Sequence, residues 1–159
     1  MRAALAQEHR RLLEDGVLRS SWVPYGLFID LNVTIDRIYG RGDYTLCKAI
    51  AYSGARQNLP TLYRIFYRVG SLAFVLKRAA RMWDVHYSSG RLSVTSGKGW
   101  ARLIIEDFAE PHMALWQSVA GWGEASAHLS GATDALASVE HGSEGDDDSP
   151  ARILIRWQE

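Results

Sequence analysis

Apolar residues recur every three to four positions through the first half of the chain. Leu27, Phe28, Leu31, Ile35 and Ile38 form one such stripe, which is typical of an amphipathic helix. Gly16, Gly40, Asn58 and Gly70 interrupt the pattern and separate its helices. The first half is therefore predicted to form helices over residues 1–14, 22–39, 43–57, 60–69 and 72–82.

From residue 83 the apolar period changes from three or four to two. Trp83, Val85 and Tyr87 alternate with polar residues, which predicts a strand over 83–88. Further strands are predicted over residues 92–95, 100–108, 135–141 and 151–157, with a helix over 111–129 that ends at Gly131. An acidic loop, residues 142–150, separates the last two strands.

This order of elements indicates the α+β class. Helices come first (residues 1–81) and strands follow (residues 82–159), which favours an antiparallel sheet. We predict a single domain over residues 1–159, with an N-terminal helical half packed on a C-terminal sheet of about five strands and one long helix inserted.

Composition and charge exclude several classes of protein. Residues 1–81 carry 13 Lys and Arg against 6 Asp and Glu, net +7, whereas residues 82–159 carry 5 against 12, net −7. The basic residues do not alternate with aromatic ones as in a nucleic-acid groove, so no nucleic-acid partner is expected. No apolar stretch is long enough for a membrane span and no signal pattern opens the chain. With one cysteine, Cys47, predicted to be buried and unreactive, a cytoplasmic location is expected.

Several short segments resemble a known superfamily in their order along the chain. They are Trp22–Tyr25, Tyr39–Asp43, Met82–Tyr87, Leu103–Phe108, Ala120–Trp122 and a last strand ending in Trp157. Over about residues 20–157 the chain resembles the ligand-binding superfamily of four-vinyl-reductase-type domains, haem-nitric-oxide-binding domains and TRAPP subunits. It is most similar to an uncharacterised bacterial branch of that superfamily.

The resemblance implies an apolar cavity between the helices and the sheet. The candidate lining residues are the large aromatic residues on inward faces, namely Phe28, Phe66, Phe74, Trp83, Trp116 and Trp122. The alternative is that these side chains only fill the core, because burying each one stabilises the fold by about 1.5–3 kcal/mol without a ligand.

Haem is the most specific ligand that the resemblance suggests. Tyr87, Ser89 and Arg91 match the Tyr-x-Ser-x-Arg pattern that holds the haem propionates in haem-nitric-oxide-binding domains. However, the helices upstream of Tyr87 contain no histidine between His9 and His86 that could bind the iron. The sequence therefore disfavours haem and favours an ordinary β-turn at these residues.

Metal and catalytic sites are not expected. Glu140 lies where related domains have a Glu followed by two Cys, but Ser143 replaces the first cysteine, which disfavours zinc. The run Asp146–Asp148 lacks the alternation of a calcium loop. The histidines are scattered and no serine or cysteine lies in a nucleophile motif, so no enzyme is predicted.

We therefore predict a bacterial, non-catalytic sensor or adaptor that binds a small apolar ligand, a protein partner, or both. A stand-alone sensor has to pass its state to another protein, so a homodimer or a hetero-partner is expected. Two alternatives stay open: a haem-binding gas sensor and a ligand-free interaction scaffold.

Overall fold

The computed structural model describes residues 1–18, 21–69, 72–81, 83–142, 144 and 149–158, without the side chains of residues 2, 60–69, 73 and 79. Its helical elements are a short 3-10 turn, η1 (Arg2–Ala4), and helices α1 (Gln7–Asp15), α2 (Tyr25–Tyr39), α3 (Thr45–Val69), α4 (Leu72–Ala80), α5 (Trp83–His86) and α6 (Met113–Leu129). Its strands are β1 (Arg91–Gly97), β2 (Trp100–Glu106), β3 (Thr133–His141) and β4 (Ala151–Gln158).

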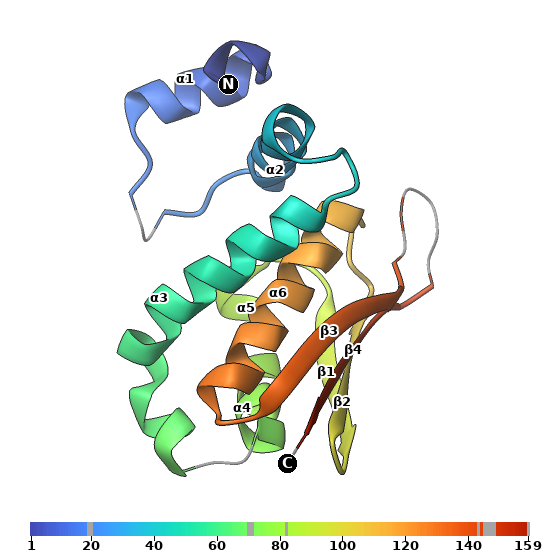
Figure 1. Cartoon of the computed structure of the whole chain (residues 1–159). Coiled ribbons are helices and arrows are strands. Elements are labelled where there is room, and N and C mark those ends of the chain that lie inside the picture. The colour runs from blue at the N-terminus through green and yellow to red at the C-terminus, as the bar shows by residue number, and fades with distance from the viewer. Residues whose placement is uncertain (19–20, 70–71, 82, 143, 145–148, 159) are drawn as a thin grey trace.

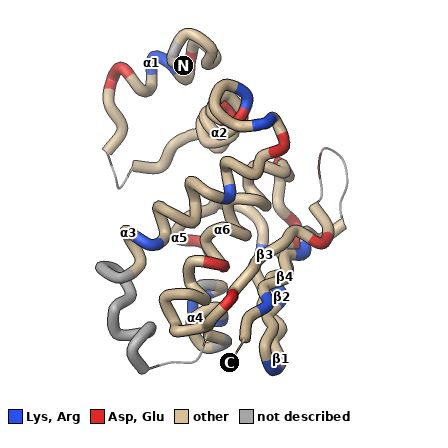
Figure 2. The backbone as a smooth tube through the Cα atoms, in the orientation of Figure 1, with Lys and Arg blue, Asp and Glu red and all other residues tan. Residues whose placement is uncertain are grey.

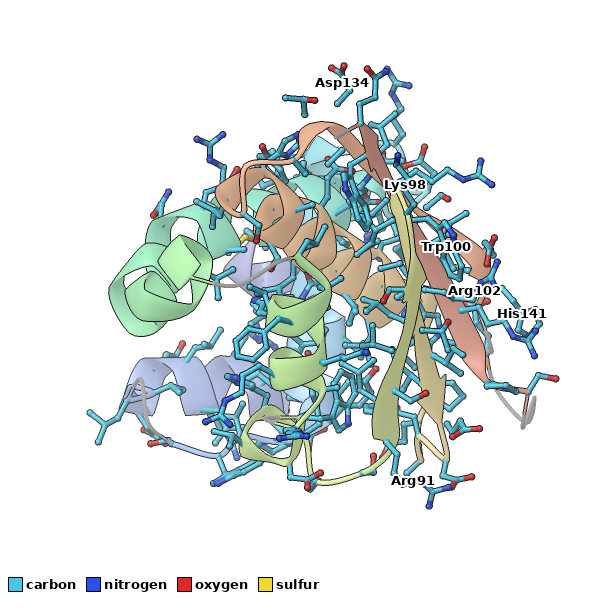
Figure 3. The ribbon with its side chains drawn as sticks, turned by 90° about the horizontal axis from the view of Figure 1, so that it is seen from below. Arg91, Lys98, Trp100, Arg102, Asp134 and His141 are labelled. Carbon is cyan, nitrogen blue, oxygen red and sulfur yellow. The ribbon has the colours of Figure 1, made fainter. Side chains whose placement is uncertain are left out.

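The four strands form one antiparallel sheet in the order β1-β2-β4-β3. The connection from β2 to β3 passes through α6, which packs across one face of the sheet, and α3 in turn covers α6 (Figure 1). Helix α4 packs beside β1. No helix formed by the described residues lies on the opposite face of the sheet (Figure 3). The α+β class with an antiparallel sheet is thus confirmed.

The prediction of about five strands is wrong, because residues 83–86 form helix α5. The amide of Tyr87 donates to the carbonyl of Trp83 at 3.0 Å, and the two rings stack with centroids 4.3 Å apart. Val85, which a strand would bury with them, is 62% exposed. Residues four apart share a helix face, so burial of Trp83 and Tyr87 satisfies a helix as well as a strand.

The predicted break at Asn58–Pro60 is also absent, since α3 continues from Thr45 to Val69. Ala55 and Leu59 are buried and pack against Ala125 of α6. Packing of one helix face on a neighbour supplies most helical stability in proteins, and it outweighs a local breaker here.

Helices α3 and α6 approach each other closely at Gly121. A Cβ atom added there would lie 2.1 Å from the carbonyl oxygen of Lys48. On the same pair of helices, Lys48 Nζ lies 2.7 Å from the carboxylate of Glu124 and donates to the carbonyl of Ala137 in β3 at 2.6 Å. This cluster joins α3, α6 and the sheet.

Helix α1 lies next to α2 and away from the remaining helices (Figure 1). The carboxylate of Asp30 in α2 accepts the amide of Ala6 at 2.9 Å, and the same oxygen lies 2.6 Å from Nδ1 of His9. Burial by itself would raise the pKa of Asp30, but these contacts outweigh it and lower the pKa.

A lowered pKa in the folded state means that protonation of Asp30 opposes the docking of α1. Ionised Asp30 stabilises the docked position of α1. This stabilisation is fully present above the ordinary aspartate pKa of about 3.9, and it is lost as the pH falls through the lower pKa of the folded state. We expect the hydrogen-exchange protection of residues 7–15, taken relative to the intrinsic rate at each pH, to fall below about pH 4, and Asp30→Asn to lower it at neutral pH. Unchanged exchange in Asp30→Asn would show that Asp30 does not hold α1.

No helix in the described part of the chain combines the length and apolar character needed to cross a bilayer.

Candidate functional site

A cavity of about 550 Å³ lies between the helices and the covered face of the sheet. Helices α2, α3, α4 and α6, strands β1 and β2, and the segments 22–24, 83–89 and 108–110 contribute to its wall. This volume is within the range of about 300–1,000 Å³ that is typical of small-molecule sites.

Aromatic rings form much of the wall. Tyr25 meets Phe108 edge to face with centroids 5.3 Å apart, and Phe108 meets Tyr87 in the same way at 5.8 Å. Trp83 lies in the same cluster, and its indole nitrogen donates to the carbonyl of Ser89 at 2.9 Å. These mutual contacts hold the rings in place without a ligand, so the cavity wall is preorganised.

The hydroxyl of Tyr25 is buried and has no hydrogen-bond partner in the described structure. Burial, followed by the nearby Tyr87 and Glu110, raises the pKa of Tyr25, so the phenol stays protonated and can donate. Burial also raises the pKa of Tyr87 to about 12. A buried polar group without a partner costs about 1–3 kcal/mol. Tyr25 thus brings an unpaired hydrogen-bond donor to the cavity wall, but its hydroxyl is buried, so a guest would reach it only after a shift of the ring.

Ser118 of α6 is a buried polar residue of the wall, and its hydroxyl donates to the carbonyl of Ala114 at 2.8 Å, whereas other polar residues of the wall are exposed. These are His86, Ser88 and Glu110, which are exposed, and Ser89, which is half-buried. The hydroxyl of Ser89 accepts the amide of Ala109 at 3.3 Å. A guest with a polar end would therefore place that end here and its apolar part against the rings.

Three of the six predicted lining residues, Phe28, Trp83 and Trp122, lie in the cavity wall. Trp116 is fully buried outside the wall and packs edge to face on Phe108, with centroids 5.6 Å apart. Phe74 is 51% exposed on α4 and does not line the cavity. The side chain of Phe66 lies outside the described residues.

The three residues of the Tyr-x-Ser-x-Arg pattern do not converge. Tyr87 and Ser89 line the cavity, but Arg91 does not. The side chain of Arg91 is 73% exposed and pairs with Asp107 at 2.5 Å. The first residue of β1 points to the uncovered face of the sheet, away from the cavity (Figure 3).

Sequence reasoning did not identify Tyr25 and His86 as wall residues. Tyr25 is the first residue of α2 and follows Pro24. His86 was assigned to the outward side of a strand, and the helical turn of α5 places it at the cavity instead. For His86 the predicted strand gave the wrong side, whereas Tyr25 lies in a correctly predicted helix whose orientation the sequence does not specify.

The other predicted sites lie elsewhere. Glu140 accepts two hydrogen bonds from Arg102 on the uncovered face of the sheet, at 2.7 and 3.2 Å. Ser143 and Asp146–Asp148 lie outside the described residues. Cys47 is buried, and burial, with the nearby Asp36, raises the pKa of its thiol to about 11, so an unreactive thiol is expected.

Solved structures with the same fold are H-NOX domains, which bind haem with nitric oxide or oxygen. An H-NOX protein from S. oneidensis in the Fe(II)NO state superposes with a TM-score of 0.66 at 10% identity, covering 94% of this chain and 87% of that one. An oxygen-binding H-NOX domain related to soluble guanylate cyclases gives 0.58 at 11%, covering 99% and 86%. A structure from work on H-NOX activation gives 0.59 at 13%, covering 99% and 88%.

At these sequence identities the structural similarity establishes the fold alone, and that fold is the one seen in H-NOX domains. No protein-family model matches the sequence, and no curated protein is significantly similar to it. The resemblance to the haem-nitric-oxide-binding branch is thus confirmed at the level of fold. The four-vinyl-reductase-type and TRAPP branches gain no support from these structures.

These structures correct the expectation that haem is disfavoured. One comes from work on haem distortion in the H-NOX family, and others hold Fe(II)NO or oxygen. The expectation rested on the missing histidine upstream of Tyr87. In the fold, Trp83 and residues 86–89 line the cavity, so a histidine, His86, is present in its wall.

Proposed function

We propose that this chain, acting as one domain over residues 1–159, is a non-catalytic sensor that binds haem in the cavity described above. The observation that supports this proposal is a preformed aromatic cavity of about 550 Å³ within an H-NOX fold. Haem bound there would supply an open iron coordination position at which a diatomic gas binds.

The side chains of the wall fit such a guest in three respects. Aromatic rings would contact the macrocycle, and histidine and tyrosine, both haem ligands in proteins, are present as His86, Tyr25 and Tyr87. Of these, His86, which is exposed, would bind the haem iron through its imidazole. Ser88 and Ser89 would offer hydroxyls to the propionates.

A second candidate function is binding of a planar apolar ligand without iron. The observation that favours it is the outward position of Arg91, which leaves no Lys or Arg among the described wall residues to pair with a propionate. A shift of the Tyr25 ring would then let its buried hydroxyl donate to a single polar atom of the ligand.

Haem binding is tested by titrating the purified protein with hemin and following the Soret band. We expect one hemin per chain in the wild type, and at least tenfold weaker binding in Gly54→Phe, about 1.4 kcal/mol or more. Gly54 lines the cavity, and no atom lies within 4 Å of a Cβ added there, so the new ring would occupy the guest's space. Ser53→Phe, on the exposed side of the same helix, should bind like wild type.

His86→Ala and Tyr25→Phe then separate the two candidate functions. With haem, His86→Ala should shift the Soret band and weaken binding about tenfold, whereas an iron-free ligand would be sensitive to Tyr25→Phe and not to His86→Ala. Equal hemin binding by wild type and Gly54→Phe would refute the proposal that haem enters this cavity.

A further inference from the structure

The uncovered face of the sheet carries a basic and apolar surface that the proposed sensor site does not use. Its outward side chains form cross-strand rows. Trp100, Arg156 and Leu136 pair across β2, β4 and β3, and Arg102 pairs with Leu154 in the next row. We call these five residues, with Arg152, the basic sheet face. Trp100 and Arg102 point away from the helices (Figure 3).

The surface is hollowed at its centre. Gly99, Trp100, Arg102, Leu154 and Arg156 enclose a depression of about 280 Å³. Arg102 lies over the ring of Trp100 at 5.7 Å from its centroid, and Leu154 at the base is only 6% exposed. Leu136, beside Arg156, is 69% exposed. The depression thus has an apolar base and a rim that contains guanidinium groups.

The basic sheet face carries three arginines, and the acidic side chain among them is Glu140, whereas Glu106, Asp107 and Asp134 lie at the ends of their strands. Arg102, Arg156 and Arg152 all act on the one carboxylate of Glu140; the hydrogen bond from Arg102 is the largest effect that lowers the pKa of that group. Arg102 makes the ion pair with Glu140, and no ion pair of Arg152 or Arg156 is found within the described part of the chain. Figure 2 shows basic positions within β2 and β4, although residues 82–159 are net acidic.

We propose that the basic sheet face is the docking surface for an acidic segment of a separate partner protein, with an apolar side chain of that segment in the depression. Carboxylates of the segment would pair with Arg152 and Arg156, and the apolar side chain would contact Leu154 and Trp100. Charge complementarity of this kind gives specificity and speeds association.

Two other occupants fit the surface less well. A second copy of the chain, joined by a two-fold axis through this face, would oppose like charges. A nucleic acid needs a continuous track of cations, but Glu106, Asp107, Asp134 and Glu140 lie on or beside this face.

The strands also connect this surface to the cavity. Leu103 lines the cavity, and its neighbour Arg102 points to the opposite side of β2. Side chains alternate between the two faces of a strand, so a shift of β2 caused by a guest would move Arg102 and Trp100 as well. A partner on this face would thus be placed to respond to cavity occupancy.

Docking is tested with a blocked peptide, Glu-Glu-Glu-Leu-Glu-Glu-Glu, titrated into the ¹⁵N-labelled full chain. We expect the indole N–H of Trp100 and the Nε–H of Arg102 and Arg156 to shift, with affinity that falls as salt rises. Arg156→Glu should weaken binding at least tenfold, and Arg152→Glu likewise. Arg37→Glu, which makes the same charge change on exposed α2, should stay within twofold of wild type.

Three outcomes would overturn the proposal: no shift at the basic sheet face, equal binding of a peptide with Gln in place of Glu, or equal weakening by Arg37→Glu. Tighter binding of a DNA duplex at the same residues would replace the acidic protein by a nucleic acid. An amide spectrum that is unchanged outside this face verifies that each variant is folded. The titration needs no haem, so its result is independent of the hemin experiment.

Discussion

Gly121→Ala is expected to destabilise the protein by about 3 kcal/mol, the upper end of the usual cost of overpacking. The added Cβ would lie 2.1 Å from the carbonyl oxygen of Lys48 and 3.0 Å from the amide nitrogen of Tyr52, both backbone atoms of α3. Backbone cannot rotate away as a side chain can, so α3 and α6 would have to separate. That movement would also strain the contact between Lys48 and Glu124, which are 2.7 Å apart.

Gly54→Ala on α3 provides the matched control. No atom lies within 4 Å of a Cβ added at Gly54, so this change should stabilise the helix by about 0.5–1 kcal/mol. Urea denaturation measures both variants, with the slope checked for two-state behaviour. If Gly121→Ala were neutral or stabilising, the close crossing of α3 and α6 at this residue would be wrong.

The long amphipathic elements could be predicted from sequence because burial imposes a period on them. The stripe of Leu27 and Ile35 and the alternation around Leu103 correspond to α2 and β2. Gly131, after the end of α6, adopts φ 89°, as a C-terminal glycine does. These patterns are local in the sequence, and each is sufficient to predict its helix or strand without knowledge of the tertiary structure.

The predictions that were wrong concern elements whose structure is decided by tertiary packing. Trp83 and Tyr87 are compatible with a strand or with one helical turn, and only their stacking in the cavity wall decides between the two. For the same reason the candidate site was predicted only in part. Which aromatic rings face a cavity and which face the core depends on how α6 is rotated against the sheet, and the sequence period does not specify that rotation.

Trp116→Ala is expected to lower the free energy of unfolding by about 3–5 kcal/mol, the usual cost of truncating a large core aromatic side chain. Trp116 has no exposed surface and belongs to the main core cluster, where it packs on Phe108 and close to Gly142. Alanine would leave a void that the strands on one side and α6 on the other could fill only by moving together.

Trp122→Ala, six residues further along α6, distinguishes core from cavity. Trp122 is half-buried and lines the cavity, so its truncation enlarges a space that already exists and should cost about half as much, roughly 2 kcal/mol. Hemin affinity should respond in the opposite order, with a clear loss in Trp122→Ala and little change in any Trp116→Ala protein that remains folded. Thermal unfolding and hemin titration of the two variants measure both quantities. If Trp116→Ala weakened hemin binding more than Trp122→Ala, the guest would lie deeper than the described wall, beyond Phe108 and towards the centre of the sheet.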